Sequence, residues 1–108
     1  MNDYYDRNSD TIGRDEWMKL FEDIEYRRVA LYEEGNYTVS TVWLGLDHSF
    51  GEGKPLIFET LVIRGADYEG EVMYRATTEE EALDQHAMVV SMLESVPLED
   101  LHEGSGYR

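Results

Sequence analysis

The stretch YRRVALYEEGNYTVSTVWL, residues 26–44, places two runs rich in β-branched and aromatic residues on either side of Gly35 and Asn36. Such residues favour strands, and a two-residue Gly-Asn connection between two strand-like runs predicts a β-hairpin. The turn also sets a register. The expected cross-strand pairs are Glu34 with Tyr37, Tyr32 with Val39, Ala30 with Thr41 and Arg28 with Trp43.

The two faces of this hairpin differ in composition. We expect the core face to be the one shared by the aliphatic residues Val29, Leu31, Val42 and Leu44. The opposite face would gather Tyr32, Tyr37, Val39 and Trp43 beside Arg28. If both helices pack on the aliphatic face, this aromatic face is an exposed binding surface; if one helix covers each face, its residues belong to the core. The sequence leaves both arrangements open.

Outward from the hairpin, Trp17, Leu20, Phe21 and Ile24 recur at helical spacing, which predicts a helix from Arg14 to Asp23. Residues 55–64 are nearly continuously apolar and predict a central strand covered on both sides, and residues 71–76 predict a fourth, shorter strand. Thr77 and Thr78, followed by three glutamates, offer capping-box spacings for a helix from about Glu79 to Glu94.

The expected fold is therefore α+β: an N-terminal helix, a four-stranded antiparallel meander and a C-terminal helix. Its 108 residues suit one small domain. We expect about residues 1–10 and 102–108 to be flexible. Tyr4–Tyr5 and Thr11–Ile12 flank a turn-rich segment, and they form either a very short hairpin or an extended arm.

The chain is strongly acidic, with 24 Asp and Glu against 9 Lys and Arg and a net charge of −15. Direct nucleic-acid binding is disfavoured, because that affinity depends on basic side chains. The same charge would attract a basic or nucleic-acid-binding protein partner. Neither a signal peptide nor a membrane-spanning run is visible, and the absence of cysteine is compatible with a cytoplasmic location.

The loop from Asp47 to Lys54 holds His48 and two glycines between strand-like runs. Asp47-His48-Ser49 cannot form a catalytic triad, since consecutive side chains point in different directions. Gly53-Lys54 is followed by Pro55 and a strand in place of a helix, so it is not a phosphate-binding loop. The remaining catalytic candidates are His48 as acid or base and Glu59 near it.

No histidine pair has the spacing of a metal centre, and we expect neither a metal nor a cofactor. His86 falls on the apolar stripe of the C-terminal helix, which predicts a hydrogen-bonded histidine at the margin of the core.

The segment Ser40 to Gly53, continuing through Pro55 to Thr60, resembles a family of small proteins of phage and bacterial genomes. The resemblance extends to Tyr4-Tyr5-Asp6-Arg7, Asp15-Glu16-Trp17, the segment Glu25 to Ala30, and Tyr74 to Thr77 with the helix start that follows, so that it covers about residues 4–90. It implies a phage or mobile-element origin. No established activity comes with it, so it assigns no catalytic residue.

The sequence thus favours a non-enzymatic accessory protein, phage-associated, that acts by binding another protein. Its sharper form inhibits a host nucleic-acid-binding defence protein, with carboxylates standing in for phosphates. A small enzyme or ligand-binding domain with its site at the Asp47–Lys54 loop and a virion or assembly component are the alternatives, and a homodimer is possible. The candidate binding residues are Tyr32, Tyr37, Trp43, Asp47, His48, Phe50 and Glu52.

Overall fold

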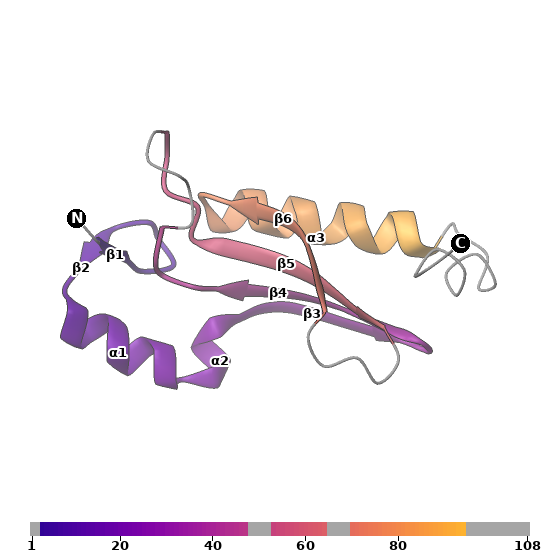
Figure 1. Cartoon of the computed structure of the whole chain (residues 1–108), viewed down its shortest axis with the longest axis horizontal. Coiled ribbons are helices and arrows are strands. Elements are labelled where there is room, and N and C mark those ends of the chain that lie inside the picture. Colours follow the sequence, from indigo (N-terminus) through magenta and orange to yellow (C-terminus); the bar gives the residue numbers. More distant parts are fainter. Residues whose placement is uncertain (1–2, 48–52, 65–69, 95–108) are drawn as a thin grey trace.

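A computed structural model describes residues 3–47, 53–64 and 70–94 of the chain. The chain has an α+β fold (Figure 1). Its elements are β1 (Tyr4–Tyr5), β2 (Thr11–Ile12), α1 (Arg14–Glu22), α2 (Ile24–Arg27), β3 (Arg28–Glu34), β4 (Tyr37–Trp43), β5 (Phe58–Arg64), β6 (Glu71–Ala76) and α3 (Glu79–Glu94).

The main sheet contains β3, β4, β5 and β6 in the order of the sequence, each antiparallel to its neighbour. The predicted turn is present, with Gly35 at a φ of 55°. The first three predicted pairs of the β3–β4 hairpin are confirmed. The fourth is wrong: Arg28 lies opposite Val42, because a bulge between Arg28 and Ala30 shifts the register. A second bulge lies on β6, between the partners of Thr60 and Leu61.

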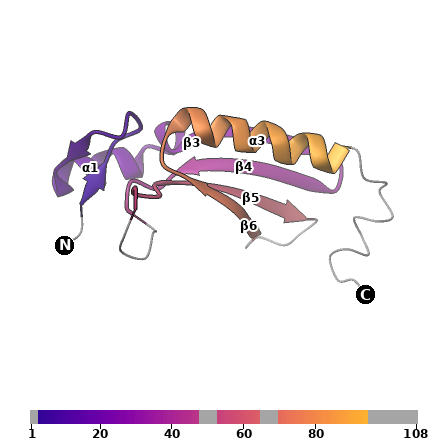
Figure 2. The same cartoon turned by 90° about the horizontal axis from the view of Figure 1, so that it is seen from above.

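Helix α3 lies along one face of the sheet and contacts all four strands (Figure 2). The buried residues of β4 are Tyr37, Val39, Thr41 and Trp43, so the aromatic face of the hairpin is the core face. The expectation that Val29, Leu31, Val42 and Leu44 form the core face is wrong. Leu31 is 42% exposed, and Val29 alone of the four packs against the core, because the bulge turns it toward the α3 side.

The predicted start and end of α3 are confirmed. The capping-box prediction is confirmed at Thr78, whose Oγ1 accepts a hydrogen bond from the Glu81 N–H at 3.1 Å. The Glu81 carboxylate in turn accepts from the Thr77 N–H at 3.0 Å. From this start, Ala82 and Val89 reach the buried layer over β4 and β5.

The N-terminal region matches its prediction only in part. Residues 3–10 form β1 and the turn that pairs it with β2, so of the two open arrangements the structure has the hairpin. The flexibility expected of about residues 1–10 and 102–108 stays a prediction, and residues 102–108 lie outside the described residues. The helix predicted from Arg14 to Asp23 ends one residue earlier, at Glu22, and Ile24, which the helical spacing placed on its apolar face, is 59% exposed. Asp23 starts the separate helix α2 by accepting hydrogen bonds from the Glu25 and Tyr26 N–H groups, which also makes Tyr26 helical and not part of a strand.

The third predicted strand begins later than expected, at Phe58, and residues 55–57 precede it. It is central in the sheet, between β4 and β6. It is not covered on both sides: Phe58, Thr60 and Val62 are buried under α3, while the alternate residues are only partly buried. Its apolar run therefore supplies one core face and one face that no described helix covers.

Candidate functional site

The loop residues proposed from the sequence are only partly visible. His48, Phe50 and Glu52 lie outside the described residues. Asp47 Oδ1 accepts a hydrogen bond from the Leu56 N–H at 2.9 Å, which joins the two ends of the loop. Glu59 lies on β5, where its Oε2 is 3.3 Å from Nη2 of Arg75, so its carboxylate is already engaged in an ion pair.

The aromatic candidates belong to the interior. Trp43 is fully buried, its Nε1–H donates to the Tyr5 carbonyl at 3.0 Å, and its ring meets that of Tyr26 edge-on. Tyr37 is 7% exposed. Tyr32 is less buried, and its hydroxyl donates to the Glu94 carboxylate, which raises the pKa of Tyr32 to about 12. An exposed aromatic cluster on this face is therefore ruled out by the packing of α3.

A buried polar group connects α3 to the middle of the sheet. Thr41 and Thr60 are buried and opposite each other on β4 and β5, and their hydroxyls are 2.7 Å apart. His86 Nδ1 lies 2.9 Å from Thr41 Oγ1, which confirms the prediction of a hydrogen-bonded histidine at the margin of the core. Burial lowers the pKa of His86, because it disfavours the imidazolium.

This lowered pKa predicts a pH dependence of stability. The unfolded chain takes up a proton on His86 near pH 6.5, whereas the folded protein takes it up only at lower pH. The free energy of unfolding is therefore expected to fall as the pH drops below about 6.5, and the loss is complete below the folded pKa. Urea denaturation of wild type and His86→Gln between neutral and mildly acidic pH measures it. Parallel pH profiles would contradict the prediction.

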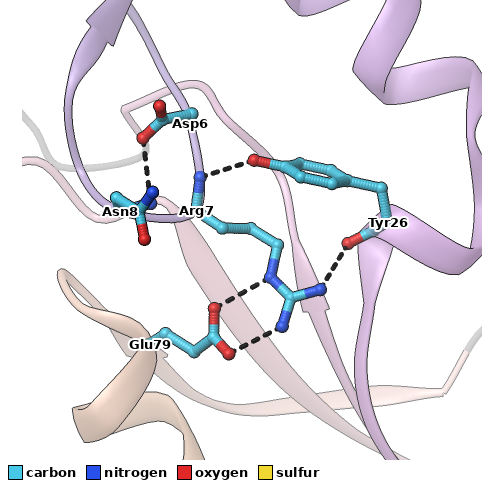
Figure 3. Close-up of polar contacts among 5 residues, drawn as sticks. All are labelled: Asp6, Arg7, Asn8, Tyr26 and Glu79. Atoms are coloured by element: carbon cyan, nitrogen blue, oxygen red, sulfur yellow. Dashed lines mark hydrogen bonds and ion pairs between the residues drawn. The ribbon is translucent and has the colours of Figure 1, made fainter.

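A second polar cluster joins three distant segments around Arg7 (Figure 3). Arg7 Nε and Nη2 donate to the two carboxylate oxygens of Glu79 at 2.8 and 2.6 Å, and Nη1 donates to the Tyr26 carbonyl at 3.0 Å. The Arg7 backbone N–H donates to the Tyr26 hydroxyl at 2.8 Å. We call Arg7, Tyr26 and Glu79 the N-terminal clasp.

The N-terminal clasp has a structural role. The hydrogen bonds from Arg7 hold the pKa of Glu79 below its ordinary value, so the carboxylate stays ionised. Both carboxylate oxygens accept from the guanidinium, and the guanidinium is shared between Glu79 and Tyr26. Arg7 is 72 residues away from Glu79, and no local pattern around either residue indicates the contact. The clasp fastens the β1–β2 turn and α2 to the start of α3.

Replacing Arg7 with alanine is expected to lower the free energy of unfolding by about 2 kcal/mol, because the change removes a bidentate, partly buried ion pair and a third hydrogen bond. Lysine keeps the charge but not the planar fork, so Arg7→Lys is expected to recover less than half of the loss.

Arg75→Ala is the matched control for the Arg7 substitutions. Its ion pair with Glu59 is longer, at 3.3 Å, and Arg75 is 36% exposed against 24% for Arg7. We therefore expect a loss below about 1 kcal/mol. Chemical denaturation measures both variants, and equal losses would show that the clasp is no stronger than a surface ion pair.

Apart from α2, which borders it beside Arg28, Ser40 and Val42, no described element covers the face of the sheet opposite α3 (Figure 2). Every residue on it is exposed or partly exposed. We call it the open sheet face, and it consists of Arg28, Leu31, Glu33, Thr38, Ser40, Val42, Glu59, Leu61, Ile63, Val72 and Arg75.

An apolar row crosses the middle of the open sheet face. Leu31 lies opposite Ser40, Ser40 opposite Leu61, and Leu61 opposite Val72, so the row includes one residue from every strand. Leu31 and Val72 are each 42% exposed. Val42 and Ile63 flank the row on the two inner strands. The row is apolar except at Ser40, and apolar surface of this kind, exposed or partly exposed, occurs at interaction sites.

Comparison with family models, with curated proteins and with solved structures gives no match. The assignment of a site therefore depends on the geometry alone, and the resemblance described above stays a prediction. Within residues 3–47, 53–64 and 70–94, no three His, Asp or Glu side chains gather as metal ligands would. In the same part of the chain, no helix is long and apolar enough to span a membrane.

The open sheet face includes none of the binding residues that were proposed from the sequence. Of the two proposed catalytic candidates, it includes Glu59. A signal for it was present in the sequence, since Leu31, Val42, Leu61 and Val72 alternate with the residues that are now buried. Two of them, Leu31 and Val42, were expected on the core face of the hairpin. What sequence reasoning missed is which of the two faces α3 covers.

Proposed function

We propose that this protein is a non-enzymatic binding module that contacts a partner protein through the open sheet face. The apolar row of Leu31, Leu61 and Val72 is the observation that carries the proposal. Burying these side chains against a partner would remove apolar area from water at about 25 cal/mol per Å². Glu59, the catalytic candidate that lies in this region, is already engaged in an ion pair with Arg75.

The charge of the chain supports a basic partner. At a net charge of −15, two copies repel each other, whereas a partner rich in Lys and Arg is attracted over several ångströms. On the open sheet face itself the described charges are few and mixed, with Arg28, Glu33 and the Glu59–Arg75 pair around the apolar row. The partner surface that fits this face is therefore apolar at its centre with few charges around it, and the basic character of the partner is favoured by the charge of the whole chain.

Paired charge substitutions test the surface. Leu31→Glu and Val72→Glu introduce a carboxylate into the apolar row at exposed positions, where folding is retained. Leu83→Glu and Met88→Glu are matched controls, because these α3 residues are 43% and 42% exposed, as Leu31 and Val72 are, but do not lie on the open sheet face. Proteins captured on immobilised wild type are compared with those captured on each variant.

We expect the two open-face variants to lose a protein that wild type and both α3 variants retain. Equal capture by all four variants, or equal loss, would overturn the proposal. Sedimentation of the purified protein over a range of concentrations provides a second arm. Dimerisation of wild type that Leu31→Glu abolishes would make the occupant a second copy of this chain, contrary to the charge argument.

The finer form of the proposal is a phage-encoded inhibitor of a host nucleic-acid-binding defence protein. The large acidic excess supports it, because spaced carboxylates can occupy a groove that binds phosphates. Such binding weakens steeply with added salt, whereas apolar contacts do not. Capture that is insensitive to salt would therefore rule out charge mimicry while leaving the binding module itself intact.

A further inference from the structure

A small cavity lies where the open sheet face meets α2. Its volume is about 220 Å³. Phe21, Val42 and Leu44 contribute apolar wall, and the polar lining comes from Arg27, Arg28 and Ser40. Because pockets for drug-sized ligands have roughly 300–1,000 Å³, this cavity suits a smaller molecule.

The chain path brings two consecutive arginines to the same cavity. In a regular strand, neighbouring side chains point to opposite faces. Arg27 is the last residue of α2, however, and Arg28 is both the cap of that helix and the first residue of β3, with a φ of −81° and a ψ of 110°. The β-bulge follows directly after Arg28. This junction of helix, strand and bulge places both side chains on the cavity wall.

Neither arginine has a carboxylate partner among the described residues, where the ion pairs involve Arg7, Arg64 and Arg75. The guanidinium of Arg27 stacks over the Phe21 ring, with Cζ 4.6 Å from the centroid, so its orientation is fixed. Arg27 Nε is buried without a hydrogen-bond partner. In a chain with 24 acidic residues, a buried guanidinium donor without a partner, on a residue that lines a cavity, carries a free-energy cost that an anion reaching this N–H would remove.

We infer that this cavity binds a small organic anion, a carboxylate or a phosphate monoester, with its charged group between Arg27 and Arg28 and its apolar body against Phe21 and Leu44. Guanidinium groups recognise both anions through paired N–H donors, and the Ser40 hydroxyl adds a further hydrogen-bonding group. Burial of the ligand's apolar body is favourable because it removes apolar area from water. An anion that lacks an apolar body is disfavoured, because the negative field of the whole chain repels it. The inference does not rest on the partner-binding proposal, although the cavity shares Arg28, Ser40 and Val42 with the open sheet face.

Isothermal titration calorimetry of the full chain with matched probes tests the site. Hexanoate and phenyl phosphate are the two anionic arms, and they distinguish a carboxylate ligand from a phosphate ligand. Hexanol and hexylammonium have the same apolar body without the negative charge. We expect at least one anion to bind and both other probes to fail.

Substitution of the arginines gives the second readout. Loss of a charge-assisted hydrogen bond costs about 1.5–3 kcal/mol, so Arg27→Gln and Arg28→Gln are each expected to weaken anion binding about 10- to 100-fold. Arg14→Gln, which removes an exposed charge that does not line the cavity, should leave it unchanged. Arg28 is exposed, so Arg28→Gln decides the question even if Arg27→Gln does not fold.

Three results would overturn the inference: no binding of either anion at millimolar concentration, equal binding of hexylammonium, or anion binding that survives Arg28→Gln. Val72→Glu is expected to leave anion binding in place, because Val72 lies on β6 and no residue of β5 or β6 lines the cavity. Failure of the partner-binding test and failure of the anion test are therefore separate outcomes.

Discussion

Replacing Trp43 with alanine is expected to lower the free energy of unfolding by about 3–5 kcal/mol, which is a large part of the stability of a small domain. Trp43 is fully buried and packs edge-on against Tyr26. Its removal leaves a cavity between β4 and the N-terminal helices, and it also leaves the Tyr5 carbonyl without the hydrogen bond from the indole Nε1. Chemical denaturation followed by far-UV circular dichroism measures the loss.

Leu31→Ala provides the comparison, because Leu31 is an aliphatic residue of the same hairpin on the other face and is 42% exposed. We expect a loss below about 1 kcal/mol there, as for most surface positions. Trp43→Phe should fall between the two, since it retains apolar volume but not the indole N–H. A loss at Trp43 no larger than that at Leu31 would mean that the two faces of the sheet have been assigned in reverse.

Replacing Gly45 with alanine is expected to cost about 2–5 kcal/mol. Gly45 has a φ of 78°, a region that L-residues with a Cβ avoid at a cost of about 1–2 kcal/mol. A Cβ at this position would also lie 2.6 Å from Trp43 Cζ2 and would collide with the Trp17 ring. Relieving that overlap displaces buried aromatic rings, which adds about 1–3 kcal/mol. Trp17 would be displaced from the Leu44 carbonyl that its Nε1–H contacts at 3.0 Å.

Gly35→Ala separates the two contributions to the Gly45 effect. Gly35 also has a positive φ, 55°, but an added Cβ meets no atom within 4 Å. Only the backbone cost of about 1–2 kcal/mol should therefore appear. Thermal or urea unfolding of both variants gives the comparison, and similar losses would show that the aromatic contact around Gly45 relaxes without cost.

The parts of the fold that depend on neighbouring residues were predictable from the sequence. Gly35 and Asn36 set the β3–β4 register as far as Ala30, and Thr78 with Glu81 marks the start of α3. The Asp23 cap that starts α2 was also a local signal, which the apolar spacing through Ile24 concealed. Local chemistry of this kind acts over a few residues and can be recognised in one sequence.

The choice of core face could not be made in the same way. Each face of β4 and the residue after it contains both apolar and small polar residues, so Tyr37, Val39 and Trp43 compete with Val42 and Leu44 for the core. The aromatic face also holds two hydroxyl groups, Thr41 and Thr60, which are buried because they bond to each other and because Thr41 bonds to His86. The hydrogen bond with His86 that helps to compensate for burying these hydroxyls exists only once α3 packs on the sheet.

The candidate sites depend on contacts between distant segments for the same reason. The clasp joins residues 72 positions apart, and the cavity joins α1, α2 and β4 around two arginines that adjoin in sequence but change direction at a helix end. The loop around His48 was predicted as a candidate site because its potentially catalytic residues are neighbours in the sequence. The described part of that loop instead shows a hydrogen bond from the Leu56 backbone N–H to the Asp47 carboxylate.

The two bulges lie on β3 and β6, the outermost strands of the sheet. An outer strand has unpaired backbone groups that can template the addition of strands from other molecules, the first step toward fibrils. A bulge interrupts that template and increases the local twist, so a foreign strand cannot continue the ladder in register. We therefore expect this protein to resist ordered aggregation at high concentration even though one face of its sheet is bare.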